Sequence, residues 1–240
     1  MEEAYDLLAV CPTGAVSIFG KKAEDSLPPP PKEMGTYMEE LIANRRSCRR
    51  YQKKNVNPAL ITRMLKSMAA APTGGNCCSV EYTVIDDKDR VEEIRRIVYK
   101  IMEKNAKRHI YTDSFDDFYY AKMKESEQSI RKDDMLFCGA PHLFIAHAKQ
   151  TGKWGEDMKI NCDLATAYFE LLANSFGLGT IIMSYPAEVI EQLAPVARDM
   201  MGIPADHYMR LIVGFGYPEI PYARGVQKDC SGRIHRYTER

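Results

Sequence analysis

The stretch from Asp163 to Thr180, DLATAYFELLANSFGLGT, predicts the best-defined helix of the chain. Apolar and small residues recur on neighbouring turns of a helix that runs from Asp157 to Phe176, which gives this helix a wide apolar face. Gly177 follows and fits a C-terminal cap, because glycine readily adopts the left-handed backbone that ends helices. Small residues within the helix favour close packing against another helix, including one from a second subunit. The predicted face consists of Leu164, Ala165, Tyr168, Leu171, Leu172 and Ser175, and the small residues are Ala165, Ala167 and Ala173.

Helical and extended patterns occur on both sides of this helix without a strict strand–helix–strand repeat. Asn57 and Pro58 predict a helix start, since asparagine caps helices and proline fits the first helical position. Pro186 opens another predicted helix that reaches about Met201. The mixture favours an α+β fold over a doubly wound α/β fold. The other predicted elements are helices over 36–44, 58–71 and 89–107, and strands at 81–85, 143–148 and 210–213.

The segment from Tyr111 to Tyr120 is rich in aromatic and acidic residues and belongs to no clear periodic element. One interpretation is a surface excursion that covers a ligand. Ordinary packing of a helix that follows it is the alternative.

Length and charge narrow the class of protein. A chain of 240 residues is long enough for one large or two small domains. Lysine and arginine total 33, and aspartate and glutamate also total 33, so the overall charge favours neither nucleic acid nor an anionic membrane as a partner. The start, MEEAYD, is acidic, and apolar runs such as Leu143–Ala146 are far too short to span a membrane. We therefore expect a cytoplasmic protein.

The cysteines and histidines show no spacing typical of a disulfide framework or a metal site. Seven scattered cysteines without a C-x2-C pair indicate reduced thiols. Cys77 and Cys78 are adjacent, which allows a redox or nucleophilic role, but small packing residues in a loop are the favoured interpretation. None of the five histidines forms a known ligand motif, and neither G-x-G-x-x-G after a strand nor a P-loop is present. The sequence thus predicts no metal site and no nucleotide site of those types.

The N-terminal stretch VCPTGAVSI, residues 10–18, resembles the end of a bacterial ferredoxin motif, in which the last cysteine precedes proline. The other three ligands would fall at positions 1, 4 and 7, which hold Met1, Ala4 and Leu7. Because a four-iron cluster needs four thiolates, this segment is expected to be a degenerate remnant or a cut end. Four consecutive prolines at 28–31 then predict an extended linker. We expect residues 1–35 to form this remnant and linker, and residues 36–240 the main domain.

A basic cluster follows the helix predicted from Thr36: Arg45, Arg46, Ser47, Arg49 and Arg50. Guanidinium groups and a hydroxyl offer many hydrogen-bond donors, which suits a phosphate or a polyhydroxy chain. A solvated helix end that neutralises the helix dipole is the alternative.

Five stretches in order resemble motifs of the nitroreductase-like flavoprotein family. RRSCRRY at 45–51 is similar to the family's R-R-S-x-R-x-F, and APTGGNCCSV at 71–80 to its A-P-S-x-x-N-x-Q-P-W loop. The others are CGAPHLFIAHA at 138–148, DLATAYFELLANSFGLGT at 163–180 and VGFGYPEIPYARGVQKD at 213–229. A branch of this family carries an N-terminal ferredoxin domain ending in C-P-T-G-A. The resemblance implies a three-layer α/β/α sandwich, an intertwined homodimer and a flavin mononucleotide (FMN) at the subunit interface.

The same resemblance implies which residues bind FMN. Arg45, Arg46, Ser47 and Arg49 would hold the phosphate and ribityl chain, and Arg224 or Lys228 would complete the phosphate site. Pro72, Thr73 and Asn76 would come from the partner subunit, and the backbone around Met183 and Ser184 would face the flavin ring near N5. Cys78 and Val80 stand where the motif has glutamine and tryptophan.

The implied activity is FMN-dependent reduction of nitroaromatic, quinone or similar acceptors by electrons from NAD(P)H. The cofactor supplies the redox chemistry, so no catalytic acid or base is assigned to the chain. One alternative is a flavoprotein reduced by a ferredoxin-type donor, and the other is a non-catalytic FMN-binding redox sensor or carrier.

Overall fold

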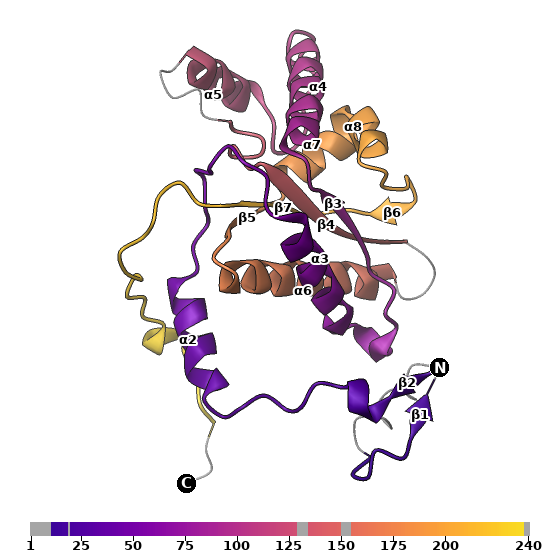
Figure 1. Ribbon diagram of the computed structural model, residues 1–240. Helices are drawn as coiled ribbons and strands as arrows, with labels where there is room; N and C mark the ends of the chain where they lie inside the picture. Colours follow the sequence, from indigo (N-terminus) through magenta and orange to yellow (C-terminus); the bar gives the residue numbers. More distant parts are fainter. Residues whose placement is uncertain (1–10, 19, 129–133, 150–154, 238–240) are drawn as a thin grey trace.

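The computed structural model describes residues 11–18, 20–128, 134–149 and 155–237. Its main sheet has the order β3-β4-β7-β5, with every pair antiparallel (Figure 1). Strand β4 lies inside the sheet, and β6 pairs with its far end. The strands are β3 Glu81–Ile85, β4 His142–Lys149, β5 Gly179–Met183, β6 His207–Tyr208 and β7 Ile212–Gly216.

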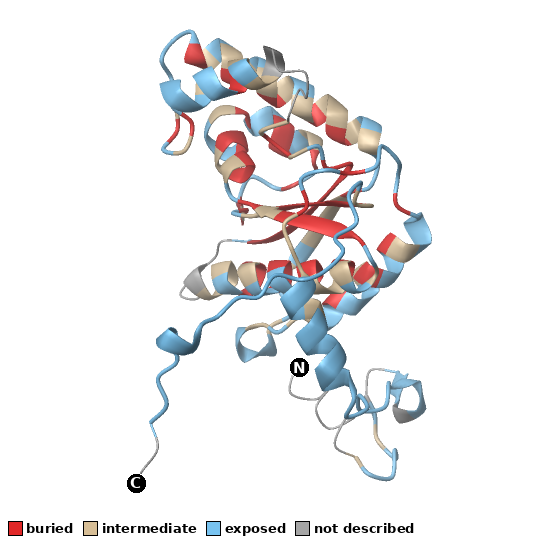
Figure 2. Ribbon diagram, turned by 90° about the vertical axis from the view of Figure 1, so that its left-hand side faces the viewer, coloured by how far each residue is buried: buried red, intermediate tan, exposed pale blue. Residues whose placement is uncertain are grey.

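Helices cover both faces of this sheet, so the predicted α+β three-layer sandwich is confirmed. On one face, α6 (Gly155–Ser175) and α3 (Pro58–Ser67) pack with side chains such as Phe144 and Phe215. On the other face, α4 (Lys88–Ala106), α7 (Tyr185–Leu193) and α8 (Pro195–Met200) pack with Leu143 and Ile145. Figure 2 shows the buried residues concentrated in the sheet and on the helix surfaces that face it.

Local sequence signals fix where several elements begin and end. The Asn57 side chain accepts a hydrogen bond from the backbone N–H of Ala59 at 2.9 Å, which caps α3 as predicted. Asp87 caps α4 in the same way through the N–H of Asp89. Gly177 has a φ of 74°, so the left-handed cap expected after α6 is present.

The structure corrects three expectations about elements. The single helix expected from Pro186 to Met201 is two, because Pro195 lacks the N–H that would continue α7 and instead opens α8. Strands β5 and β6 were not expected, since β5 begins only two residues after the cap at Gly177 and the two residues of β6 carry no periodicity. The segment 111–120 is not simply a surface excursion, because Phe115 is fully buried and α5 (Asp117–Gln128) begins within it.

The predicted apolar face of α6 is divided between two environments. Ala165 and Ala173 are buried with Phe169 against the sheet, whereas Leu164 and Tyr168 remain 39% and 49% exposed on the opposite side. The two apolar surfaces therefore face in different directions, and among the described residues only the sheet-facing one is buried.

The N-terminal region contains few buried residues. A hairpin of β1 (Ser17–Ile18) and β2 (Lys21–Lys22) leads through a 3-10 turn at Ala23–Asp25 into the proline segment, which is exposed. Helix α2 (Met34–Asn44) follows and contains no buried residue. Positions 1, 4 and 7 of the ferredoxin-like pattern lie outside the described residues, so the boundary at residue 35 stays a prediction. Short 3-10 turns occur at Met68–Ala70, Gly74–Asn76 and Ser231–Arg233.

In the part of the chain that the structure describes, no helix combines the length and apolar character needed to cross a membrane.

Candidate cofactor-binding site

The arginine-rich segment leaves α2 and runs along the outer edge of β5. Arg45 ends the helix with a ψ of 133°, which turns the backbone to an extended course. The N–H of Cys48 then donates to the carbonyl of Thr180 at 2.7 Å, and Ser47 forms a parallel bridge with Thr180. A Cβ atom at position 179 would lie 2.7 Å from the Cys48 side chain, so only glycine allows this approach. The fold therefore anchors the segment to the sheet edge at Cys48.

Cys48 is the buried centre of this segment, and its neighbours point elsewhere. It is 5% exposed, and burial raises the pKa of its thiol, which keeps it protonated at neutral pH. Cys48 is thus a packing residue in the RRSCRR motif. Ser47 is half-buried and Arg49 is exposed. Among the described residues, no hydrogen bond or ion pair engages the Arg49 guanidinium, so its donors are available to a ligand.

Arg45 is held by a polar network that the sequence did not predict. Its Nη1 lies 3.0 Å from Oε1 of Glu170, a residue that is only 8% exposed. The Thr180 hydroxyl lies 3.4 Å from the same carboxylate oxygen, and Nδ2 of Asn174 donates to that hydroxyl at 2.7 Å. This network fixes the position of one guanidinium and compensates its charge. Arg45 and Glu170 are 125 residues apart, so no local pattern could have indicated the pair.

The C-terminal tail brings Arg224 beside Arg46. The Arg46 guanidinium stacks over the Tyr222 ring at 4.9 Å and contacts the Arg224 carbonyl at 3.5 Å. Gly225 passes so close to the end of α2 that a Cβ there would lie 2.6 Å from Oδ1 of Asn44. Figure 1 shows this tail, in yellow, beside α2. Lys228 lies further along the tail and is exposed, without a side-chain hydrogen bond or ion pair to any described residue.

The loop with Pro72, Thr73 and Asn76 lies near the other end of α6. The N–H of Gly74 donates to Oδ1 of Asn161 at 2.9 Å, and the Thr73 hydroxyl accepts from the N–H of Cys78 at 3.0 Å.

Asn161 precedes Glu170 by nine residues, or about 13 Å along the helix axis. One chain therefore does not bring this loop together with the arginines. Asn76 itself is exposed and has a φ of 52°.

Met183 and Ser184 occupy the end of β5 and the start of α7. Met183 is 8% exposed, whereas Ser184 is exposed at the N-cap position of α7. Ser184 also lines a cavity of about 260 Å³ together with Glu188, Glu191 and Arg210. Thr180, beside Ser47, lies three residues before Met183 on the same strand.

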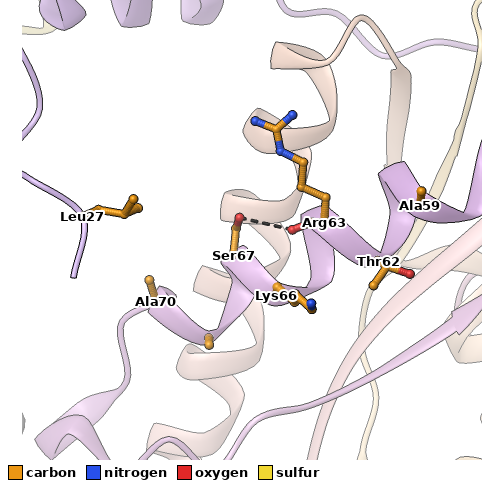
Figure 3. A pocket seen from close by; sticks show the side chains of 8 residues that line it. Leu27, Ala59, Thr62, Arg63, Lys66, Ser67 and Ala70 are labelled. Carbon is orange, nitrogen blue, oxygen red and sulfur yellow. Dashed lines mark hydrogen bonds between the residues drawn. The ribbon is translucent and has the colours of Figure 1, made fainter. Parts of the chain in front are cut away.

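A larger cavity lies away from all of these residues. It measures about 700 Å³ and lies between Leu27 of the N-terminal segment and α3, where Arg63, Lys66 and Ser67 line it (Figure 3). None of the eleven residues expected to bind a cofactor contributes to its wall. This cavity is therefore not the cofactor site that the sequence predicts.

Comparisons with known proteins identify the family. Among proteins with curated functions, none matches the sequence. Solved structures share the fold, including a nitroreductase with bound FMN from Bacteroides fragilis at 20% identity, with a TM-score of 0.65 over 84% of this chain and 98% of that one. A nitroreductase with bound FMN from Desulfitobacterium hafniense is 19% identical, with a TM-score of 0.63 over 84% and 98% of the two chains.

An FMN and NADPH-dependent nitroreductase from sphigopyxis sp. strain HMH is 18% identical, with a TM-score of 0.60 over 84% of this chain and 99% of that one. The sequence model that describes the nitroreductase family matches residues 42–217, which include the arginine segment and the whole sheet. The chain therefore belongs to the nitroreductase family.

Proposed function

We propose that this protein is an FMN-dependent oxidoreductase that works as a homodimer and transfers electrons from NAD(P)H to nitroaromatic, quinone or similar acceptors. The observation that carries the proposal is the group of arginines anchored at the edge of β5, in a chain of the nitroreductase family. The nitroreductases of similar fold that contain bound FMN support the choice of cofactor.

The donors at the β5 edge fit a phosphate. Arg49 offers a guanidinium that no described residue engages by a hydrogen bond or an ion pair, and Ser47 adds a hydroxyl on the same extended segment. Arg46 and the tail around Arg224 lie beside them. Because Glu170 compensates the charge of Arg45, we assign Arg45 to positioning and Arg49 to direct phosphate binding.

Exposed apolar side chains support a dimer that completes the site. On α2, Tyr37 and Ile42 are 66% and 56% exposed, and on α6 Ile160 and Tyr168 are 56% and 49% exposed. Apolar side chains gathered in this way are typical of protein interfaces. In a dimer formed through these helices, the loop with Thr73 and Asn76 would reach the arginines of the partner, which it cannot reach within its own chain.

The chemistry that bound FMN would supply is two-electron transfer between a nicotinamide and an acceptor. The residues of the chain bind and position the reactants and exclude water. We assign no protein group to proton transfer at the reacting atoms.

Arg49→Ala tests the binding site, and Arg50→Ala is its matched control. Both residues are exposed and adjacent, but only Arg49 belongs to the proposed phosphate site. Loss of a charge-assisted hydrogen bond to phosphate should cost about 1.5 to 3 kcal/mol, or roughly tenfold to a hundredfold in FMN affinity. Arg50→Ala should leave affinity within about threefold. Equal affinities for the two variants, measured by flavin fluorescence during FMN titration, would remove Arg49 from the site.

Mixed dimers test whether two chains build each site. Asn76→Gly removes the amide but keeps the left-handed backbone, so the loop should retain its shape. If sites combine arginines of one chain with the loop of the other, mixing Arg49→Ala and Asn76→Gly chains should create heterodimers with one intact site. FMN retention above that of either variant alone supports this arrangement. Retention equal to the average of the two variants contradicts it.

The N-terminal sequence CPTGA at 11–15 favours one second candidate, in which a reduced ferredoxin-type protein donates the electrons. Bleaching of the flavin absorbance under anaerobic conditions distinguishes the donors. Bleaching by NADH or NADPH supports the nicotinamide route. Bleaching only by a reduced ferredoxin supports the alternative.

A further inference from the structure

Three potential metal ligands from separate parts of the sequence meet at one edge of the sheet. Glu81 is the first residue of β3 and pairs directly opposite His147 on β4. His207 lies on β6, which pairs with the same end of β4. One ligand atom from each of these three side chains lies within 4.8 Å of the other two. Histidine spacing along the sequence predicted no metal site, because three strands assemble this group only in the folded chain.

The two histidine rings are already oriented toward each other. Nδ1 of His147 lies 2.9 Å from Nδ1 of His207, and Nε2 of His207 lies 3.9 Å from Oε1 of Glu81. Nε2 of His147 lies 2.9 Å from the Thr83 hydroxyl. If Nε2 of His147 carries the proton and donates it to Thr83, Nδ1 keeps its lone pair for a ligand. Such outer hydrogen bonds commonly fix the tautomer of metal-binding histidines.

Two of the three proposed ligands are buried, and the third faces solvent. His147 and His207 are 3% and 9% exposed. The side chain of Glu81 is 63% exposed, which gives the group a path to solvent.

The nearby Arg198 does not occupy the ligand atoms. Its guanidinium pairs with Glu191 at 2.7 Å and contacts the backbone carbonyls of Pro204 and His207. These contacts hold β6 in place, and therefore fix the backbone that carries His207.

We propose that Glu81, His147 and His207 bind a divalent transition-metal ion, for which zinc(II) is the best match. Two imidazole nitrogens and one carboxylate oxygen suit zinc better than magnesium or calcium, which prefer oxygen ligands throughout. Three protein ligands leave one tetrahedral position for water. The ion would tie β3 and β6 to the end of β4, and Glu81 would transmit this constraint to the loop that ends just before β3.

Calorimetric titration of metal-free protein with zinc chloride tests the site. Wild-type protein should bind one zinc ion per chain at this site and unfold at a higher temperature when zinc is present. Glu81→Gln should weaken binding by about tenfold to a hundredfold, since loss even of an outer-shell partner has an effect of that size. Asp206→Asn is the matched control. It removes an exposed carboxylate next to His207 that pairs with Lys149, so binding should be unchanged.

His207→Gln provides a second test if circular dichroism shows that it folds, and Glu81→Gln alone suffices if it does not. Zinc-edge X-ray absorption of the wild-type complex should show nitrogen and oxygen ligands without sulfur. Sulfur ligands would place the ion on cysteines and overturn the proposal. Absence of zinc binding, or equal affinities for wild type, Glu81→Gln and Asp206→Asn, would also overturn it.

Discussion

Two surfaces of α6 have similar apolar composition but different environments. Cys162, Ala165, Phe169 and Ala173 are buried against the sheet, where the Phe169 ring stacks on Phe144 with 3.8 Å between centroids. On the opposite side, Ile160, Leu164 and Tyr168 are 39–56% exposed. The first surface is explained by the fold of one chain. The second, like the exposed apolar side chains of α2, remains uncovered among the described residues, which a partner chain would explain.

Because of this difference, we expect one surface to contribute to the free energy of folding and the other to the free energy of association. Burying an apolar side chain stabilises the state in which it is buried. Substitutions on the sheet-facing surface should therefore change the stability of the folded chain, and those on the outer surface should change association of the chains.

Phe169→Ala should have the largest effect, on the fold itself. The substitution leaves a cavity between Phe144 and Phe215, whose ring centroid lies 5.3 Å from that of Phe169. Such replacements in protein cores cost about 3 to 5 kcal/mol of unfolding free energy. Urea denaturation followed by circular dichroism measures this loss. A change below about 1 kcal/mol would show that the sheet-facing surface is not the stabilising core.

Tyr168→Glu should have a smaller effect, on association of the chains in the proposed dimer. A charge placed in an apolar interface should cost about 2 kcal/mol or more, which raises the dimer dissociation constant by roughly thirtyfold. Analytical ultracentrifugation over a concentration series measures this constant. The secondary structure of the isolated chain should be unchanged, because Tyr168 is already half exposed.

Ser175→Ala is the control for this prediction. Ser175 is exposed on the same helix, and its hydroxyl donates only to the carbonyl of Leu172. Both folding and association should stay within about 0.5 kcal/mol of wild type. A wild-type chain that remains monomeric at every concentration would contradict the assignment of the outer surface.

The same helix shows what could be predicted from the sequence. Its extent was predicted closely, as was β3, because hydrophobic period, caps and flanking glycine are local signals. Which side of α6 faces the sheet could not be predicted, since apolar residues occur on both. Strand β5 could not be predicted, because it begins at Gly179, only two residues after the helix cap at Gly177, and no local signal separates the two.

Only part of the candidate site could be predicted from the sequence. Motif resemblance indicated the arginines, and the structure places Ser47 and Cys48 against the edge of β5 and Arg224 beside Arg46. The resemblance could not indicate Glu170, because the contact with Arg45 arises only when α6 and the end of α2 meet in the fold. Binding of FMN by these residues stays a prediction.

The smallest predicted effect is that of pH on the free energy of unfolding, through His142 in the core against which the sheet-facing surface of α6 packs. His142 is fully buried beside Phe215, with 5.2 Å between ring centroids, and its Nε2 accepts the N–H of Val56 at 2.8 Å. Burial lowers the pKa of His142, against the opposing effect of Asp86 and Asp87. Protonation would also place a donor against the Val56 N–H.

The unfolded chain therefore binds the proton more readily than the folded chain does. Stability from the neutral ring is fully present above the ordinary histidine pKa of about 6.5 and is lost as pH falls below it. The unfolding free energy should thus decline from pH 7 to pH 5, with His147 contributing in the same direction because burial also lowers its pKa.

His142→Gln keeps an acceptor for Val56 but cannot titrate, so the dependence of unfolding free energy on pH should become weaker in this variant. Urea denaturation of both proteins across this pH range provides the measurement. An identical pH dependence in wild type and variant would show that protonation of His142 does not change the free energy of unfolding. The His142 ring is buried inside the chain and does not lie on the outer surface of α6. The dimer dissociation constant should therefore not change with the protonation of His142.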